Sequence, residues 1–295
     1  MISVIIPHLN QPRELDICLA SLEAQSLYRG SFEIIVVDNG SAILPTDVVA
    51  RHSGTRLLQE AQPGPGPARN AGVAAGAGEV LAFIDADCRA HPDWLGSVVR
   101  SLHSLPPGTV LGGDVRIWQG ENAQLDAIAA YESVFAYRFK LYIERHGYCG
   151  TGNMAMLRRD FESVGPFAGI DVAEDMEWGH RARRSGLRFR YVPEMIVFHP
   201  ARGSLQELYV KWDRQIVHYR NMAEGTPAWR LRWIAQALVV LASPAPSIVT
   251  VLTSDRLHGV RHRIKAIAVM CAVRLHRVTT MLSLLRNRRV VAWNR

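Results

Sequence analysis

Val80-Leu-Ala-Phe-Ile84-Asp85-Ala86-Asp87 joins a short apolar run to two carboxylates that lie two residues apart. An uninterrupted apolar run of this length is typical of a strand that is buried on both faces of a parallel sheet. Residues 4–6 and 33–37 have the same character, and residues 55–58 are a candidate for a further strand. Because residues 12–27 repeat leucines at a helical spacing between two of these runs, the pattern predicts an α/β sheet flanked by helices.

Polar residues follow three of the predicted strands. They are the stretches Pro7-His8-Leu9-Asn10, Asp38-Asn39-Gly40-Ser41 and Asp85-Ala86-Asp87-Cys88. Each stretch alone could be an ordinary turn, because these residue types favour turns. The carboxyl ends of parallel strands, however, meet at one edge of the sheet, where ligands of α/β proteins bind. The sequence therefore predicts a functional site at this edge.

Asp85 and Asp87 are candidates for metal binding. If the chain stays extended there, both side chains point to one face of the strand and either can reach a hard cation. A divalent metal at such a site could offset the charge of a departing nucleoside diphosphate. His199 follows the apolar residues 195–198 and could join the aspartates as a ligand for a metal such as Mn²⁺. Alternatively, Asp85 and Asp87 could lie in a solvated turn, and His199 could have a purely structural role.

Three further stretches carry residues that could bind a ligand or act in catalysis. Gly64-Pro-Gly-Pro-Ala-Arg69-Asn70-Ala-Gly72 is interpreted as a loop entering a helix, where backbone N–H groups and Arg69 could face phosphate. Its glycine spacing is not that of a dinucleotide-binding fingerprint. Gly150-Thr-Gly-Asn153 predicts a turn of small residues. Glu174-Asp175-Met176-Glu177 opens a helical segment; its acids could merely complement the helix dipole, but Asp175 is the better candidate for a general base.

Composition limits the class of protein. The chain has 295 residues, of which 48% are hydrophobic and 21% charged, as expected for a globular protein. Four cysteines without paired spacing argue against a disulfide framework or a zinc site and fit a reducing cytoplasm. The first residues show no pattern of a signal peptide. The net charge of +7 comes from residues 256–295, which hold ten Lys/Arg and no Asp or Glu, and the rest of the chain has 24 basic and 27 acidic residues.

The C-terminal region suggests a membrane partner. Residues 233–254 carry no charge and are numerous enough to cross a bilayer, but Pro244 and Pro246 interrupt them. A re-entrant or interfacial helix pair is the preferred interpretation, with a buried hairpin as the alternative. Residues 264–285 form a basic amphipathic pattern that ends in Arg286-Asn-Arg288-Arg289, which favours an anionic membrane surface. Nucleic acid is not an expected partner, because the chain contains no recognisable nucleic-acid-binding module.

The order of these motifs resembles that of family 2 glycosyltransferases over about residues 1–220. Enzymes of this family have the GT-A fold, a Rossmann-like and mostly parallel sheet flanked by helices. The resemblance rests on Pro7 and Asn10 after the first strand, Val36-Val37-Asp38-Asn39-Gly40-Ser41, Gly66-Pro-Ala-Arg69-Asn70-Ala-Gly72, Phe83-Ile-Asp85-Ala-Asp87, Gly150-Thr-Gly-Asn153, Glu174-Asp175 and Phe198-His199.

The resemblance implies an inverting, hexosyltransferase-type enzyme that takes a sugar from a nucleotide-sugar donor, with a UDP-sugar favoured. It places Pro7, Asn10, Asp38, Arg69, Asp85 and Asp87 on the donor side, with Asp38 near the base, Asp85 near the ribose or sugar and Arg69 near the nucleotide or phosphates. It makes Asp87 and His199 ligands of a divalent metal, Mn²⁺ or Mg²⁺, and Asp175 the general base. It puts Gly150, Gly152, Asn153 and Glu174 on the acceptor or sugar side.

The family's processive members carry Gln-x-x-Arg-Trp, whereas Asp213-Arg214-Gln215 stands here. This departure favours transfer of a single sugar, to a lipid-linked or polysaccharide-precursor acceptor. We expect a catalytic domain over residues 1–222 and a helical, basic region over residues 223–295 that is peripheral or re-entrant at the cytoplasmic side of the cell membrane. The alternatives are a sugar nucleotidyltransferase, which usually has a glycine-rich loop where Pro7-His8-Leu9-Asn10 stands, and an inactive membrane scaffold that binds nucleotide sugars.

Overall fold

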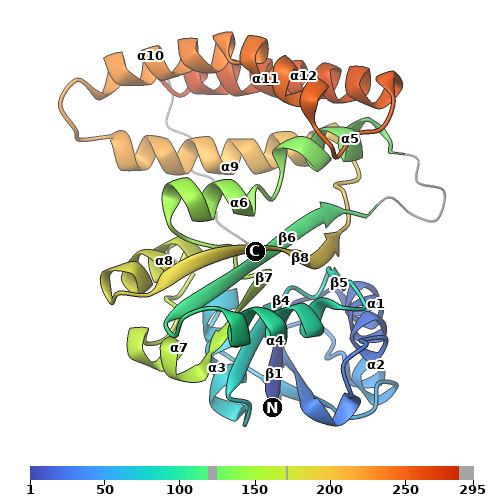
Figure 1. Cartoon of the computed structure of the whole chain (residues 1–295). Coiled ribbons are helices and arrows are strands. Elements are labelled where there is room, and N and C mark those ends of the chain that lie inside the picture. Colours follow the sequence, from blue (N-terminus) through green and yellow to red (C-terminus); the bar gives the residue numbers. More distant parts are fainter. Residues whose placement is uncertain (119–124, 171, 286–295) are drawn as a thin grey trace. The chain divides into compact units, whose positions relative to one another are not determined.

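The computed structural model describes residues 1–118, 125–170 and 172–285 and divides the chain into two compact units (Figure 1). The sheet unit consists of Met1–Arg116 and Tyr137–Pro200. The helical unit consists of Ile117–Ala136 and Ala201–Arg295. This division differs from the expected boundary at residue 222, because residues 117–136 and 201–222 group with the C-terminal helices.

The sheet unit contains one eight-stranded mixed sheet in the order β3-β2-β1-β4-β7-β6-β8-β5. Its first half is parallel, with β1 between β2 and β4 and with β3 beside β2; these strands are β1 (Ile2–His8), β2 (Phe32–Asp38), β3 (Thr55–Gln59) and β4 (Val80–Ile84). The four predicted strands are therefore confirmed. The carboxyl ends of β1 and β2 lie in register, because His8 is paired with Asp38.

The second half of the sheet introduces antiparallel pairs. β7 runs antiparallel to both β4 and β6, and β5 runs antiparallel to β8. These strands are β5 (Arg89–Ala90), β6 (Thr109–Ile117), β7 (Asn153–Leu157) and β8 (Arg188–His199). The predicted α/β fold is correct, and the sheet is mixed where the sequence suggested a mostly parallel one.

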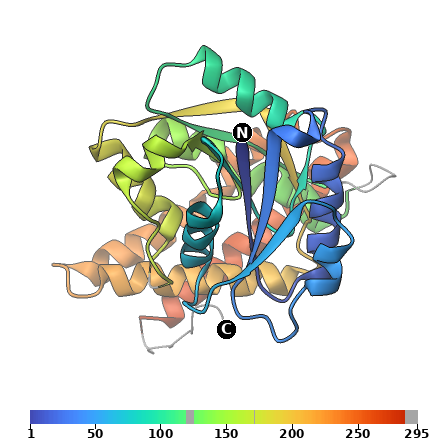
Figure 2. The same cartoon turned by 90° about the horizontal axis from the view of Figure 1, so that it is seen from below.

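Helices cover both faces of the parallel strands. Alternate residues of β2 point to opposite faces, so that Ile35 and Val37 meet Ala68 of α3 (Pro65–Ala75), whereas Ile34 and Val36 belong to the larger core that includes α1 (Pro12–Glu23). Figure 2 shows α1 and α3 on opposite sides of β1. The remaining helical segments of this unit are η1 (Arg29–Ser31), α2 (Thr46–Ala50), α4 (Trp94–Ser104), α6 (Phe139–Leu141), η2 (Tyr142–His146), α7 (Arg158–Val164) and α8 (Glu174–Arg184).

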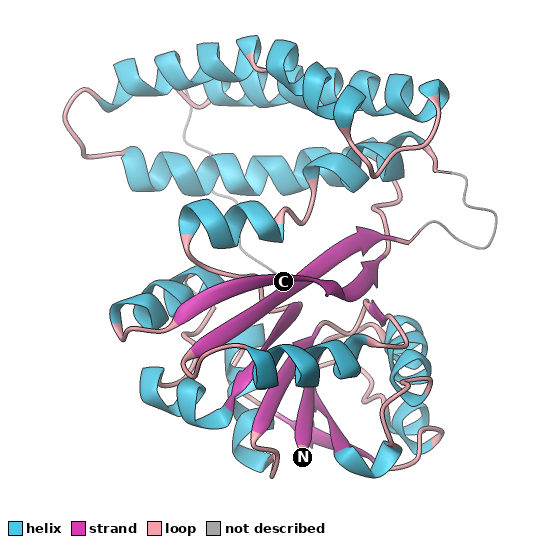
Figure 3. Cartoon of the chain, in the orientation of Figure 1, coloured by secondary structure: helices cyan, strands magenta, loops and turns pink. Residues whose placement is uncertain are grey.

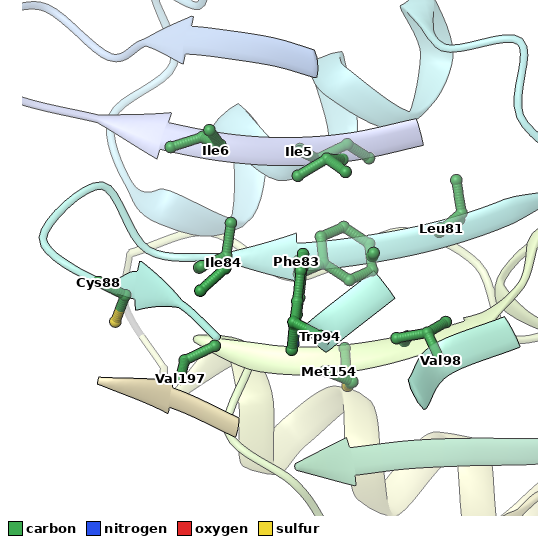
Figure 4. Close-up of a cluster of buried hydrophobic side chains, with 14 of the residues drawn as sticks. Ile5, Ile6, Leu81, Phe83, Ile84, Cys88, Trp94, Val98, Met154 and Val197 are labelled. Atoms are coloured by element: carbon green, nitrogen blue, oxygen red, sulfur yellow. The ribbon is translucent and has the colours of Figure 1, made fainter. Parts of the chain in front are cut away.

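Phe83 and Trp94 lie among aliphatic side chains in a buried hydrophobic cluster of the sheet unit (Figure 4). Phe83 of β4 and Trp94 of α4 are fully buried, and Phe83 meets the ring of Phe167 edge-on at 5.6 Å. Burial of rings of this size stabilises the unit, because it removes a large apolar surface from water. This packing fixes the end of β4, from which Asp85 and Asp87 follow.

The helical unit contains α5 (Ala127–Phe135), α9 (Leu205–Ala223), α10 (Trp229–Ala242), α11 (Pro244–Thr253) and α12 (Val260–Ser283) (Figure 3). α12 contacts the other four helices and buries Met270 and Val273 completely. Trp233 of α10 donates from Nε1 to the Met281 carbonyl at 2.9 Å. α9 and α5 join this unit because α12 packs against both, a pairing that lies too far apart in sequence for local patterns to reveal.

Two features of the described helical unit bear on the membrane prediction. α12 is long and apolar enough to cross a membrane, and α10 and α11 together pass the same test but are bent by 42° at their junction. The bend matches the break expected at Pro244. These observations are weak support, because core helices of soluble proteins satisfy the same criterion. The basic stretch 286–289 lies outside the described residues.

Candidate functional site

The ends of β1 and β2 are joined by a buried hydrogen bond between two side chains. His8 Nδ1 lies 2.9 Å from Asp38 Oδ1, and both side chains are almost completely buried. Asp38 Oδ2 accepts hydrogen bonds from the backbone N–H groups of Gly40 and Ser41. Although burial acts to raise the pKa of Asp38, hydrogen bonds from Ser41 and His8 hold it below its ordinary value. Asp38 therefore organises the turn after β2, and its contact with the nucleotide base stays a prediction.

Asn10 links the same two strand ends from the surface. Its backbone N–H donates to Ser41 Oγ at 2.8 Å, and its Oδ1 accepts from the Ala42 N–H at 2.9 Å. The backbone of Asn10 has a φ of 54°, a region that asparagine tolerates better than most residues. Pro7 lies in β1, half-buried beside Val37 of β2. Pro7 and Asn10 thus shape the loop edge that was expected to face the donor.

Arg69 connects two carboxylates that come from distant parts of the sequence. Its Nη2 donates to Asp85 Oδ1 at 2.7 Å and its Nη1 donates to Glu174 Oε1 at 2.9 Å. The guanidinium is only 4% exposed, and its Nε has no hydrogen-bond partner among the described residues. Arg69 bridges the end of β4 and the start of α8, and its expected contact with nucleotide or phosphate stays a prediction.

The glycine-rich stretch before Arg69 serves packing. α3 begins at Pro65, so most of the predicted loop is helix. A Cβ at Gly66 would lie 2.1 Å from the Ala168 carbonyl oxygen, which only glycine permits. Asn70 fixes the same neighbouring loop, because its side chain exchanges hydrogen bonds of 2.9 Å with both backbone groups of Phe167. The phosphate-cradle interpretation of this stretch is not supported.

The chain turns after β4 and does not stay extended. The Cys88 N–H donates to the Asp85 carbonyl at 3.0 Å, which closes a turn around Asp87. The condition under which Asp85 and Asp87 would share one strand face is therefore not met. Asp85 instead lies against Gly152, where a Cβ would come within 2.5 Å of its Oδ2. Gly152 thus leaves room for the Asp85 carboxylate.

Asp87 pairs with His199 at the end of β8. Asp87 Oδ2 and the Tyr137 hydroxyl lie 3.1 and 2.9 Å from His199 Nε2. Burial acts to raise the pKa of Asp87, but the contact with His199 holds it below its ordinary value; burial acts to lower the pKa of His199, but Asp87 raises it. The predicted association of Asp87 with His199 is present.

The donor set around Asp87 is compatible with a divalent cation. Ligand atoms of Asp87, Cys88 and His199 lie within 4.8 Å of one another. A carboxylate with an imidazole suits Mn²⁺ better than a thiol does. Burial raises the pKa of the Cys88 thiol well above its ordinary value, which keeps it protonated and makes it a poor ligand. Asp87 and His199 are therefore the residues that would hold the metal.

The pKa of Asp175 is shifted in a way that bears directly on catalysis. Burial, with a contribution from the neighbouring Glu174, raises its pKa to about 6, although the Met176 N–H and Arg69 oppose the shift. Its Oδ1 accepts from the Met176 N–H at 2.7 Å. A carboxyl with such a pKa is largely ionised at neutral pH and is a stronger base than an ordinary aspartate. These properties suit the role expected for Asp175.

Two residues expected on the acceptor or sugar side are structural. Asn153 is fully buried; its Nδ2 donates to the carbonyls of Asp114 and Met195, and its Oδ1 accepts from Trp94 Nε1. These hydrogen bonds satisfy the polar atoms of a side chain buried in the sheet, and the expected place of Asn153 near the sugar stays a prediction. Gly150 is also buried, and a Cβ there would lie 2.5 Å from the Phe139 ring.

Sequence reasoning missed two residues of the site. Tyr137 contacts His199 from 62 positions away, and no local pattern marks it. His8 lies in the polar stretch Pro7-His8-Leu9-Asn10, where a histidine at the end of an apolar strand is a recognisable signal. Each contacts a predicted site residue: His8 contacts Asp38, and Tyr137 contacts His199.

The fold and the polar cluster define an α/β protein with a ligand site at the carboxyl ends of its parallel strands. The family model for glycosyl transferase family 2 matches residues 3–165, more than half of the chain. The chain belongs to this family of glycosyltransferases.

Curated relatives agree with the family. Glycosyltransferase AglE from Haloferax volcanii is 31% identical over 208 residues, which cover 68% of this chain and 67% of AglE. A pre-mycofactocin glycosyltransferase from Mycobacterium tuberculosis is 28% identical over 213 residues, 70% of this chain. This chain spans only 44% of that relative.

Solved structures share the fold at low sequence identity. A mannosyltransferase, PcManGT from Pyrobaculum calidifontis, in complex with GDP-Man and Mn²⁺, has a TM-score of 0.61 and 18% identity, over 98% of this chain and 88% of that one. S. aureus TarS 1–349 in complex with UDP-GlcNAc has a TM-score of 0.55 and 16% identity, over 93% of this chain and 90% of that one. At these identities the likeness establishes the GT-A fold alone.

Proposed function

We propose that this glycosyltransferase moves one hexose from a nucleotide-sugar donor, with a UDP-sugar favoured, to a hydroxyl of a lipid-linked or polysaccharide-precursor acceptor, with inversion. The observation that carries the proposal is the cluster of Asp85, Arg69, Glu174 and Asp175, in which Asp175 has a pKa of about 6. Asp85 follows β4 directly, and Glu174 opens α8. In this cluster Asp175 can act as a base, and the ion pairs of Arg69 with Asp85 and Glu174 lie beside it.

Asp175 would act as the general base. It would take the proton from the acceptor hydroxyl while that oxygen bonds to the anomeric carbon of the donor sugar. In the same step the bond between the anomeric carbon and the diphosphate oxygen would break, and the electron pair would leave with the nucleoside diphosphate. A single displacement of this kind inverts the anomeric configuration.

Arg69 would support the base without touching substrate. It neutralises Asp85 and Glu174 at hydrogen-bond distance, so that three neighbouring carboxylates do not all repel one another. Gly152 would keep the space that the Asp85 carboxylate needs for a contact with the ribose or sugar. Pro7, Asn10 and Asp38 would shape the loop edge on the nucleotide side.

Asp87 and His199 would hold a divalent cation, Mn²⁺ or Mg²⁺. When bound, such a cation supplies Lewis-acid stabilisation of the negative charge on a diphosphate leaving group. The Pro200 carbonyl lies 2.6 Å from His199 Nδ1 and would orient the ring, as the outer hydrogen-bond partners of metal ligands commonly do. The Tyr137 hydroxyl, 2.9 Å from Nε2, would give way to the cation at that nitrogen. The complex of PcManGT with GDP-Man and Mn²⁺ supports the metal, and the complex of TarS with UDP-GlcNAc supports a UDP-sugar.

The helical unit would attach the enzyme to the cytoplasmic face of a membrane. Leu231, Val239 and Val260 are 71%, 67% and 72% exposed, which is unusual for large apolar side chains in water. Arg230, Arg232 and the basic residues after residue 255 would add attraction to anionic lipid. A peripheral or re-entrant attachment fits the bend of 42° between α10 and α11 better than a straight span does.

A thermal-shift screen of the full-length protein tests the donor assignment. UDP and UDP-sugars should raise the melting temperature when Mn²⁺ is present and much less when it is chelated, because ligands that bind the native state stabilise it. A protein that instead condenses a nucleoside triphosphate with a sugar phosphate would be a nucleotidyltransferase. A protein that binds UDP but never releases it from a UDP-sugar would be an inactive scaffold.

A further inference from the structure

A cavity of about 400 Å³ lies in the sheet unit, where η2, the end of α8 and the start of β8 meet. Its lining includes Glu144, Gly147, Arg183, Arg188 and Phe189. These residues belong to the same unit as the base, and none of them is among the donor and base residues described above.

Two arginines give the cavity a net positive charge. Arg183 and Arg188 line it, and Glu144 is the only acid among the lining residues. No hydrogen bond or ion pair reaches either guanidinium from the part of the chain that the structure describes. Arg181, two positions before Arg183, is by contrast already paired with Glu177 at 2.7 Å. The two arginines of the cavity are therefore available to an anion from outside the chain.

A short stretch of backbone runs along α8 from the cavity towards the base. A Cβ at Gly147 would lie 2.5 Å from Arg183 Cδ, and a Cβ at Gly179 would lie 2.4 Å from Tyr148 Cβ. Gly179 lies four positions after Asp175 and four before Arg183, so that all three share one side of the helix. Because a helix rises about 1.5 Å per residue, Asp175 and Arg183 are about 12 Å apart along α8. Tyr148 therefore lies between the base and the cavity.

Tyr148 belongs to a group of aromatic rings beside this stretch. The rings of Tyr148 and Tyr142 are nearly parallel, at an angle of 8° and with centroids 5.5 Å apart. The exposed ring of His180 meets Tyr148 edge-on at 6.1 Å. Both tyrosines are half-buried, so part of each ring stays accessible. Aromatic rings can hold sugars, because the C–H groups on one face of a sugar meet the negative face of the ring.

We propose that this side of α8 binds an acidic oligosaccharide as the acceptor, with Tyr148 against a sugar ring and with Arg183 and Arg188 around a carboxylate. The inference rests on the proposed function, since it names the acceptor class of the same enzyme. A carboxylate suits the two arginines because a planar guanidinium matches it in shape and charge. The carboxylate belongs to a sugar other than the one that accepts, because Asp175 and Arg183 are about 12 Å apart along the helix.

A glycan array probed with the full-length protein tests the acceptor class. The array displays oligomers of glucuronate and galacturonate, the matching neutral oligomers of glucose and galactose, and a phosphate-bearing oligomer of mannose. Binding should be confined to the uronate oligomers and should weaken as salt rises, because both arginines are exposed. Equal binding to the neutral oligomers, or binding to no oligomer, would overturn the proposal. Stronger binding to the phosphate-bearing oligomer would overturn the assignment of a carboxylate.

Four variants separate the cavity from the general positive charge of α8. Arg183→Met should weaken binding to uronate oligomers about tenfold, as expected for loss of one charged hydrogen bond. Glu144→Gln should strengthen binding severalfold, since it removes the only acid of the cavity, and misfolding cannot produce such a gain. Tyr148→Leu keeps the Cβ that packs against Gly179 but removes the ring, and it should weaken binding. Arg184→Met removes an exposed arginine outside the cavity and is the matched control, which should bind as wild type does.

Folding, the donor site and the acceptor role are checked in the same samples. Every variant should keep its melting response to UDP with Mn²⁺, and loss of that response in wild type would count against the proposed function instead. Uronate oligomers should also speed the release of UDP from a UDP-sugar by wild type. Oligomers that bind without this effect would overturn the acceptor role. Unchanged binding in both Arg183→Met and Glu144→Gln would overturn the cavity as the binding site.

Discussion

Removal of the Arg69 bridge should destabilise the sheet unit measurably. Arg69→Met keeps much of the side chain's volume but leaves Asp85 and Glu174 without their shared cation. Loss of one partner of a buried pair costs about 3–5 kcal/mol. Asp85 is 39% exposed and can be rehydrated, and the substitution also removes the unpartnered Arg69 Nε. We therefore expect a loss of about 2–3 kcal/mol in the free energy of unfolding, below the range for a fully buried pair.

Urea denaturation followed by tryptophan fluorescence measures this loss. Trp94 and Trp178 are fully buried in the sheet unit and report its unfolding. With a slope of about 2 kcal/mol per molar urea, the midpoint should fall by about 1 M. Arg51→Met, which breaks an exposed pair with Asp16, is the control and should move the midpoint far less.

A double-mutant cycle with Glu174→Gln isolates the bridge from general packing. The two substitutions together should cost clearly less than the sum of the two alone, because each removes the same contact. An Arg69→Met protein as stable as wild type, or strict additivity with Glu174→Gln, would refute the bridge as a stabilising element.

Other perturbations test the remaining parts of the site and the helical unit. Because the base must be ionised, turnover should fall as the pH drops through about 6 and stay level above it; a flat rate between pH 5 and 7 would remove Asp175 as the base. Since the folded-state pKa of Asp175 lies above its ordinary 3.8, the ionised form costs stability, and Asp175→Asn should raise the free energy of unfolding at neutral pH by about 2–3 kcal/mol, a gain that vanishes below about pH 4. Chelation should abolish release of UDP from a UDP-sugar and added Mn²⁺ should restore it, whereas His199→Ala should need far more Mn²⁺; full activity in excess chelator would exclude the metal role. Gly66→Ala should lower stability by about 1–3 kcal/mol in thermal melts, because its Cβ would lie 2.1 Å from the Ala168 carbonyl oxygen; an unchanged melting temperature would show that the neighbouring loop yields freely. Sedimentation with anionic vesicles should retain the full-length protein at low salt and release part of it at high salt, and a protein that stays in solution throughout would contradict membrane attachment.

The sequence was sufficient to predict the convergence of strand ends. Apolar runs that alternate with helices define parallel strands, and parallel strands bring their carboxyl ends to one edge. This reasoning selected the ends of β1, β2 and β4, and His8 and Asp38 do meet there. It also predicted Asp85 as a site residue, and Asp85 accepts a hydrogen bond from Arg69.

The parts that sequence could not predict depend on contacts between distant segments. Glu174 reaches Arg69 across 105 positions, and Tyr137 reaches His199 across 62. Asn153 looked like a polar residue in a turn of small residues, but β7 begins there and carries its side chain into the interior. The grouping of α9 with the C-terminal helices depends on a contact of the same kind, because α9 packs against α12 and no local pattern in α9 reveals that partner.

The central claim is that Asp175 performs the chemistry of a nucleotide-sugar-dependent glycosyltransferase. The most direct measurement is the rate of UDP release from a UDP-sugar by the full-length protein with Mn²⁺ and acceptor, for wild type and Asp175→Asn, alongside their affinities for UDP. We predict that the substitution lowers the rate by about a hundredfold or more and leaves the affinity for UDP unchanged. A variant that turns over as fast as wild type, or one that loses UDP binding together with its rate, would contradict it.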